Sequence, residues 1–313
     1  MITYNDELKL HQDYQIPTFE GWYFRIVNPF MSIAVIIGIA KTNKKQEVFI
    51  QLFHTLNNDM EKVSYDMSDF EYKEEPFEIR IKNNIFREDY LHIQDEHLSM
   101  GLNVRIEPLI KLKQNLYAPT IMGPFSYLKM MQCHHGIINL GSHIRGSYTY
   151  EYQKRPLMGI VYQEKDWGRS FPKKYIWIQS NCCKEKQGVL FLSIALIPIS
   201  SLSFTGIIMF LKIDGKEYRF ASYYGAILTH KKRTSSTYEF TIRQGIYRLE
   251  FEIEMGELYH LEAPKLGEMN REVKETLLGE TKIKIYKCNK CIETLSFYRC
   301  GIEHDQFFET NMN

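Results

Sequence analysis

Short runs of alternating apolar and polar side chains recur along most of this 313-residue chain. Successive side chains of a β-strand point to opposite faces, so each run predicts a strand that is buried on one side. Between two of these segments, Asp214-Gly215 is typical of a two-residue hairpin turn. The chain is therefore expected to form antiparallel sheets, with alternating runs at residues 77–82, 98–106, 145–152, 238–243, 247–255 and 281–287.

Helical signals are few. Asn270 can cap a helix over residues 270–278, in which Val273 and Leu277 lie four positions apart on one face. Residues 107–128 contain three prolines and interrupt all periodicity, which is typical of a long loop. We expect this loop to cover one mouth of a barrel, and we expect less than about 15% of the chain to be helical.

A weak internal repeat divides the chain. The same order of elements occurs twice: an aromatic segment with a tryptophan, then an apolar run, then a strand. The two copies are offset by about 155 to 159 residues. Two copies of one β-meander would produce this pattern. We therefore expect an all-β protein with little helix, made of two antiparallel β-barrel or β-sandwich lobes, residues 1–160 and 161–313. The interior of a barrel of about eight strands can hold one small ligand.

Composition and charge exclude several classes of protein. The 39 basic and 38 acidic residues nearly cancel, so the chain lacks the electrostatic footprint of a nucleic-acid binder. The first ten residues do not resemble a signal peptide, and the apolar runs 33–40 and 189–199 are shorter than the about 18 residues that span a bilayer. We expect a soluble, cytoplasmic protein, whose 44% hydrophobic content suffices for two moderate domains.

The six cysteines are expected to stay reduced in that compartment. Cys288 and Cys291 have the spacing of a zinc knuckle or a redox pair, but tetrahedral zinc needs a second ligand pair, and only Cys300 and His304 follow. The alternative is a hairpin turn at Asn289-Lys290 that is flanked by two incidental cysteines. We favour the turn and predict no metal site.

Residues 162–181 concentrate polar groups beside aromatic rings. The stretch holds two tryptophans, an arginine, carboxylates and amides, with Gly168 and Pro172 as bends. Glu164 and Asp166 are two positions apart and share one face of an extended strand, where like charges held close favour keeping one of them protonated. This combination indicates a pocket that is lined by aromatic rings and polar groups.

Several blocks of the sequence resemble the tocopherol cyclase family. They follow the order of that family over roughly residues 17 to 287, at 19–24, 164–168, 171–172, 177–181, 204–206 and 214–218. The resemblance implies a fold related to two-lobed, lipocalin-like proteins that include carotenoid hydratases. It also implies a cyclase or isomerase that acts, without a cofactor, on a prenylated aromatic or another isoprenoid-like hydrophobic molecule. Cys182-Cys183 stand where related chains carry a bulky residue, which alters the size or polarity of the pocket.

A cyclase of the resembled kind adds a phenol oxygen across a prenyl double bond, which requires a proton donor and stabilisation of a carbocation. Glu164 and Asp166 are the candidate donors. Aromatic faces favour cationic character by about 0.5 to 2 kcal/mol per ring. The candidate ligand-binding residues are Glu20, Trp22, Tyr23, His135, Trp167, Arg169, Trp177, Gln179 and Asn181.

These residues also have structural interpretations. Either carboxylate can pair with Arg169 or Lys165 to hold the bend between the lobes, and large aromatic side chains dominate β-barrel cores. His134 and His135 must face opposite sides of a strand, so one of them points inward. The inward histidine is either a core residue bonded to the backbone or a polar tip in the ligand cavity.

Two functions stay open. The first is a cofactor-independent cyclase or isomerase, with transient membrane contact as a means of collecting a lipid substrate. The second is a non-catalytic carrier or sensor that holds a hydrophobic small molecule in a lipocalin-like cavity. A buried carboxylate without a basic partner in that cavity would favour the enzyme.

Overall fold

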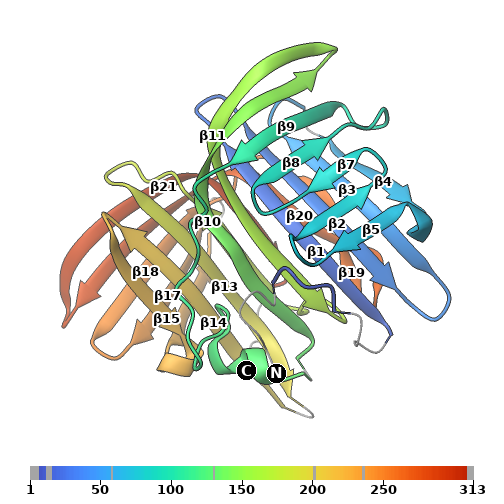
Figure 1. The fold of residues 1–313 in the computed structure, drawn as a ribbon. Helices are drawn as coiled ribbons and strands as arrows, with labels where there is room; N and C mark the ends of the chain where they lie inside the picture. Colours follow the sequence, from blue (N-terminus) through green and yellow to red (C-terminus); the bar gives the residue numbers. More distant parts are fainter. Residues whose placement is uncertain are drawn as a thin grey trace. The chain divides into compact units, whose positions relative to one another are not determined.

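The structure of the protein is a computed structural model that describes residues 7–11, 16–57, 59–129, 131–199, 202–234 and 237–308 (Figure 1). Almost all regular structure within these ranges is β. Helix is confined there to three short 3₁₀ turns, η1 (Met67–Asp69), η2 (Gly123–Tyr127) and η3 (Ser222–Tyr224). The expected all-β fold with two lipocalin-like lobes and little helix is confirmed.

The chain divides into two compact units. The first comprises Met1–Phe171 together with Leu261–Glu272, and the second comprises Pro172–His260 together with Val273–Asn313. A segment from the C-terminal half of the sequence thus belongs to the first unit. The expected domain bounds 1–160 and 161–313 stay a prediction.

One antiparallel sheet forms most of the first unit, in the strand order β4-β3-β2-β1-β11-β10-β9-β8-β7-β6-β5. Its edge strands β4 and β5 are consecutive in the chain and are joined by η1, so the sheet curls back on itself as in a barrel. The strands are β1 (Thr18–Val27), β2 (Ser32–Lys41), β3 (Gln46–His54), β4 (Met60–Tyr65), β5 (Phe70–Lys73), β6 (Glu78–Ile81), β7 (Asn84–Phe86), β8 (Tyr90–Ile93), β9 (Met100–Ile106), β10 (Cys133–Tyr150) and β11 (Gln153–Gly168).

The core of this unit lies on one face of the sheet, which we call the core face. Alternate residues of nearly every strand enter it, among them Trp22, Phe24, Val35, Ile50, Phe86 and Val104. Each fully buried side chain of this size stabilises the fold by about 1.5 to 3 kcal/mol. The long strands β10 and β11 form a hairpin that extends beyond the neighbouring strands (Figure 1).

The strands of the second unit belong to a four-stranded sheet, β12-β13-β14-β15, and to a six-stranded sheet, β16-β17-β18-β20-β19, in which β21 also pairs with β20. Most of β19 and the start of β20 lie in the segment Leu261–Glu272, which is assigned to the first unit. Asp214 and Gly215 have φ values of 46° and 82° and form the predicted hairpin turn between β14 and β15. The strands are β12 (Tyr175–Ser180), β13 (Gly188–Ile199), β14 (Leu202–Ile213), β15 (Lys216–Ala221), β16 (Ile227–Arg233), β17 (Tyr238–Gln244), β18 (Tyr247–Glu254), β19 (Tyr259–Lys265), β20 (Glu268–Lys287) and β21 (Lys290–Asp305).

The predicted helix at residues 270–278 is wrong, because this segment lies within β20 and pairs with β21. Val273 and Leu277 are both buried, as the helix prediction required. An interval of four residues brings side chains to the same face of a strand as well as of a helix, and Glu275 between them is buried too. The spacing of the buried residues therefore fits both a helix and a strand, and pairing with β21 determines that the segment is a strand.

The hairpin turn near Cys288 is confirmed, although it lies one residue earlier than predicted. Cys288 and Asn289 occupy the turn with φ values of 46° and 65°, and β21 begins at Lys290. Residues 107–128 form the predicted irregular connection, which contains η2. Its role as a cover for a barrel mouth stays a prediction.

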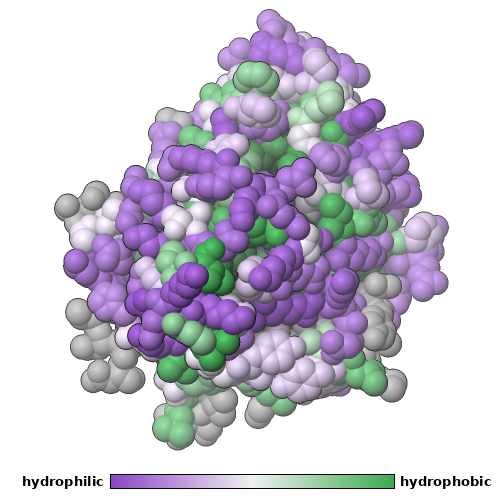
Figure 2. Space-filling model, turned by 90° about the vertical axis from the view of Figure 1, so that its left-hand side faces the viewer, coloured by the Kyte–Doolittle hydropathy of each residue, from purple (hydrophilic) through white to green (hydrophobic). Residues whose placement is uncertain are grey.

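Polar side chains cover most of the face shown in Figure 2, and apolar side chains form small separate groups there. The large apolar side chains are mostly inside the two cores. Within the described ranges, none of the helices has the length and apolar character needed to cross a bilayer.

Candidate active site

Strands β1, β11 and β10 are neighbours, and their register determines which side chains meet. Glu164 lies opposite Tyr23 of β1 and Ile137 of β10, and Asp166 lies opposite His135. Directly opposed residues of antiparallel strands share a face. The face opposite the core face therefore carries Glu164, Asp166, Tyr23 and His135. This confirms the prediction that the two acids, two positions apart, share one face of the strand.

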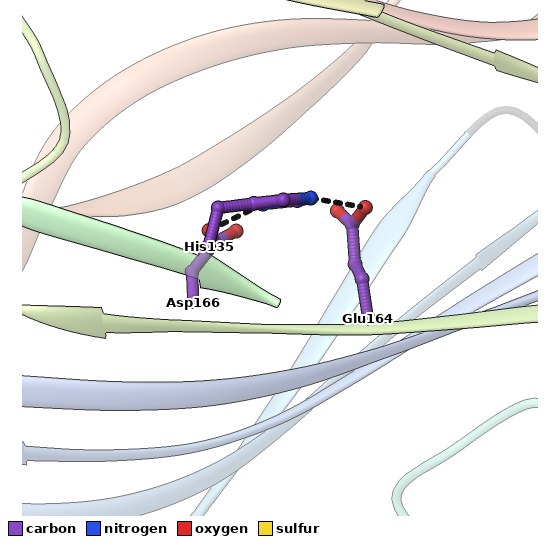
Figure 3. A group of neighbouring side chains, drawn as sticks. All are labelled: His135, Glu164 and Asp166. Atoms are coloured by element: carbon purple, nitrogen blue, oxygen red, sulfur yellow. Dashed lines mark hydrogen bonds and ion pairs between the residues drawn. The ribbon is translucent and has the colours of Figure 1, made fainter. Parts of the chain in front are cut away.

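His135 lies between the two carboxylates (Figure 3). Its Nδ1 is 2.7 Å from Oδ1 of Asp166, and its Nε2 is 3.3 Å from Oε2 of Glu164. The exposed fractions of the side chains are 11% for His135, 5% for Glu164 and 22% for Asp166. The histidine thus has an acidic partner at each ring nitrogen, and the group reaches solvent mainly through Asp166.

Opposing effects act on the charge of His135. Burial lowers the pKa of the imidazole, but the charges of Asp166 and Glu164 raise it by more, to about 9. The ring therefore carries a proton, and a positive charge, throughout the neutral range. The two flanking carboxylates compensate this buried charge.

Tyr162 supports the same group from within β11. Its hydroxyl donates a hydrogen bond of 2.5 Å to Oε2 of Glu164. Burial and the charge of Glu164 raise the pKa of the Tyr162 hydroxyl well above its ordinary value, so this side chain stays a neutral donor. Oε2 of Glu164 is therefore held by a hydroxyl on one side and approached by a protonated imidazole on the other.

The sequence-based prediction missed two residues of this face. Tyr162 is the first, and Arg25 is the second: it lies directly opposite Tyr162 on β1 and is only 1% exposed. A charged residue two positions after Tyr23, on a strand face that is otherwise apolar, was the available signal. Buried arginine is uncommon unless the charge has a role or a partner.

His135, Glu164 and Asp166 also have the donor types that a divalent cation needs. One ligand atom from each of His135, Glu164 and Asp166 lies within 4.8 Å of the others. However, both ring nitrogens of His135 are directed at the carboxylates, so binding an ion would require one of these contacts to break. The geometry fits a proton-carrying histidine.

A second polar cluster lies on the core face of β1 and β11. Nζ of Lys165 donates to Oε2 of Glu20 at 2.5 Å and to the carbonyl of Lys9, and it lies 4.5 Å and 5.2 Å from the ring centroids of Trp22 and Trp167. The Lys165 side chain is fully buried. Burial raises the pKa of Glu20, but Lys165 and His11 lower it by more, to about 2. Glu20 is thus an ionised partner of a buried ammonium.

This arrangement corrects the expected grouping of acids and tryptophans in the first unit. Trp22 lies opposite Lys165, and Trp167 follows Asp166 directly, so both tryptophans project from the core face, whereas Glu164 and Asp166 project from the other one. His134 lies on the core face, where its ring stacks on Trp167 at 5.3 Å, and His135 faces the acids. The expected opposition of the two histidines is confirmed.

The expected clasp of the acids by Arg169 or Lys165 is wrong, since their partner is His135. Arg169 follows the end of β11; its side chain is exposed and forms no ion pair with any residue that the structure describes. Its backbone N–H donates to the carbonyl of Gln132.

Trp177, Gln179 and Asn181 belong to the second unit. Trp177 and Gln179 are buried on β12, and Nε2 of Gln179 donates to Oδ1 of Asn181 at 2.6 Å. This hydrogen bond confirms that the two amides share a side, and it supplies a partner for the buried amide of Gln179. Their expected role in binding a ligand stays a prediction.

The tocopherol cyclase-like family model matches residues 80–304, which is most of the chain. The chain therefore belongs to the tocopherol cyclase-like family. The matched region contains His135, Glu164 and Asp166, whereas the block at residues 19–24 precedes it. Membership in this family supports a cyclase-like or isomerase-like enzyme in general.

Solved structures show the same fold at very low sequence identity. A protein from Nitrosomonas europaea assigned as AttH gives a TM-score of 0.57 at 11% identity, covering 98% of this chain and 97% of that chain. CghA with Sch210972 gives 0.54 at 7% identity, covering 94% and 90%. Kievitone hydratase from Nectria haematococca gives 0.50 at 8% identity, covering 92% and 88%. No curated protein sequence matches the chain significantly.

Proposed function

We propose that this member of the tocopherol cyclase-like family is a cofactor-independent cyclase or isomerase that acts on a prenylated aromatic or another isoprenoid-like hydrophobic molecule. The observation that carries the proposal is the protonated His135 held between Glu164 and Asp166. A positioned acid beside a positioned base is the arrangement that general acid–base catalysis needs. The hydratase and cyclase names among the related proteins support the same class of chemistry.

The strength of the acid narrows the reaction. An imidazolium with a pKa of about 9 readily protonates an oxygen that gains negative charge, but it protonates an isolated alkene poorly. We therefore favour a double bond conjugated with a carbonyl group. This refines the earlier expectation, in which a carboxylic acid was the donor to an isolated prenyl double bond.

The proposed step balances without a co-reactant. The substrate hydroxyl gives its proton to Asp166, the more exposed carboxylate, and its oxygen bonds to the alkene carbon farther from the carbonyl group. The alkene electron pair forms a new double bond to the carbonyl carbon, and the carbonyl π pair moves to its oxygen, which takes the proton from His135. The proton on Asp166 then returns to His135 across their 2.7 Å contact, and the enol tautomerises to an isomer of the substrate.

The alternative is a carrier or sensor of a hydrophobic molecule. A lipocalin-like fold is compatible with it. A carrier, however, gains nothing from a charged histidine that is buried between two acids, since removing these groups from water costs free energy. This cost favours the enzyme.

The test uses prenylated hydroquinones and prenylated phenols bearing a conjugated enone, incubated in D₂O with the full chain. An enzyme converts one of them to an isomer that carries one carbon-bound deuterium, detected by mass spectrometry. His135→Gln and Asp166→Asn should slow conversion by about 10² to 10⁴. The matched control His97→Gln changes a side chain that is 71% exposed and should leave the rate unchanged.

Two results would contradict the proposal. One is conversion by His135→Gln at the unmodified rate. The other is saturable binding of a substrate by native mass spectrometry with no isomer formed, which would favour the carrier.

A further inference from the structure

Two exposed arginines lie side by side on the first unit, far from the candidate active site. Arg105 of β9 is directly opposite Arg145 of β10, so their Cβ atoms are about 5 Å apart on one face of the sheet. Neither forms an ion pair with any residue in the described ranges. Like charges placed directly opposite each other destabilise a sheet, so this pair is unfavourable for the fold.

A hollow of about 710 Å³ adjoins the pair. It is lined by Arg87, Asp89, Tyr90, Asn103, Arg105, Ile106, Glu107 and Leu109. Its volume is within the range of about 300 to 1,000 Å³ that is typical of small-molecule sites. A ligand of that size could therefore contact Arg105 directly.

The polar groups of the hollow are arranged as donors around Arg105. Tyr90 lies opposite Arg105 on β8, and its hydroxyl donates to Oδ1 of Asn103 at 3.2 Å. That bond uses the amide oxygen of Asn103 and leaves its nitrogen as a further donor. Of the two acids that line the hollow, Asp89 is paired with Arg87 at 3.2 Å. Arg105 and the adjacent Arg145 outnumber the remaining acid, Glu107.

We propose that this hollow binds the phosphate group of a phosphate ester, with Arg105 and Arg145 as its principal ligands. Guanidinium groups match phosphate oxygens in charge and in bidentate geometry. Leu109 would contact the organic part of the ester. Met158, which lies opposite Arg145 and is 64% exposed, extends the apolar surface beside the phosphate.

The site is separate from the proposed acid–base chemistry. Arg145 lies ten residues along β10 from His135, which corresponds to about 30 Å at about 3.3 Å per residue. The proposal therefore does not depend on the proposed function. The phosphate could belong to a soluble ester or to a lipid headgroup in a membrane, and the same side chains would recognise both.

The test measures binding of the full chain to inorganic phosphate, to geranyl phosphate and to vesicles of phosphatidylcholine with or without phosphatidic acid. Arg105→Gln and Arg145→Gln should each weaken binding at least about tenfold, and added salt should weaken it further. The control is Arg155→Gln, an exposed arginine of the same hairpin that projects from the other face and bonds to Gln153. It should bind like the unmodified chain.

A preference for geranyl phosphate or for phosphatidic acid vesicles identifies the source of the phosphate, and either one supports the site. Thermal unfolding separates recognition from folding, because removing one of two opposed positive charges should leave the melting temperature unchanged or raise it. The proposal is overturned if no probe binds, or if binding survives in both variants. It is also overturned if both variants melt at lower temperature than the control, since the arginines would then be structural.

Discussion

Asp166→Asn should lower the pKa of His135 more than any other single substitution at the site. Asp166 is the largest of the charges that raise this pKa, and it is closer to the ring than Glu164, at 2.7 Å against 3.3 Å. Loss of an opposite charge at such a distance shifts a pKa by about 1 to 3 units. Glu164→Gln should act in the same direction and by less. With both carboxylates neutralised, burial outweighs the weaker attraction of the Glu7 charge, so the pKa of His135 should fall below 6.5.

The same group makes the stability of the fold depend on pH. His135 has a pKa of about 9 when folded against an ordinary 6.5, and at about 1.4 kcal/mol per unit this difference corresponds to about 3 kcal/mol. Because the folded pKa is raised, this contribution is complete below pH 6.5 and is lost as the pH rises through 9. Asp166→Asn should lose less free energy of unfolding over that range.

Two measurements check these values. Titration of the His135 ring signal by NMR, assigned by its absence in His135→Gln, gives the pKa in each variant. Urea unfolding at pH 6 and pH 9.5 gives the change in the free energy of unfolding. A pKa near 6.5 in the unmodified chain, or one that stays near 9 in Asp166→Asn, would refute the electrostatic argument.

Three further predictions concern stability, measured by urea or thermal unfolding. Lys165→Met should destabilise the fold by about 3 to 5 kcal/mol because it leaves Glu20 buried without its main partner; the double variant with Glu20→Leu should recover most of this loss, and an equally unstable double variant would contradict the ion-pair argument. Tyr162→Phe removes a hydrogen bond to a buried carboxylate and should cost about 1.5 to 3 kcal/mol; an unchanged midpoint would show that the bond is not needed. In Gly38→Ala the added methyl carbon would lie 2.1 Å from the ring of Phe49, so the ring must move at a cost of about 1 to 3 kcal/mol, and a variant as stable as the unmodified chain would show that the ring moves freely.

The strands and the faces of single strands were predictable because they depend on local alternation. The shared face of Glu164 and Asp166 followed from their spacing. The same rule places Trp167 on the other face of the strand. The predicted grouping of Trp167 with the acids was wrong because it relied on their closeness in sequence and not on the direction of the side chains.

The partners of the acids were not predictable, because they depend on long-range pairing. His135 meets Asp166 through a β10–β11 register that is interrupted by irregularities between Ile137 and Ser142. Because side chains alternate along a strand, one of the two histidines had to face inward, but the alternation alone did not say which one. Counting residues back from the hairpin does not decide it either, because a bulge shifts the register. Lys165 and Glu20 are 145 residues apart, so their pairing requires knowledge that β1 joins β11.

The dependence of turnover on pH tests the role of His135 most directly. Once a substrate that the protein isomerises has been identified, the pH dependence of kcat/KM reports the ionisation of groups in the free enzyme. We expect kcat/KM of the unmodified chain to fall as the pH rises through about 9, and we expect that fall to begin at lower pH in Asp166→Asn. An alkaline limb that stays in place in Asp166→Asn, or that persists unchanged in His135→Gln, would contradict the assignment of His135 as the proton donor.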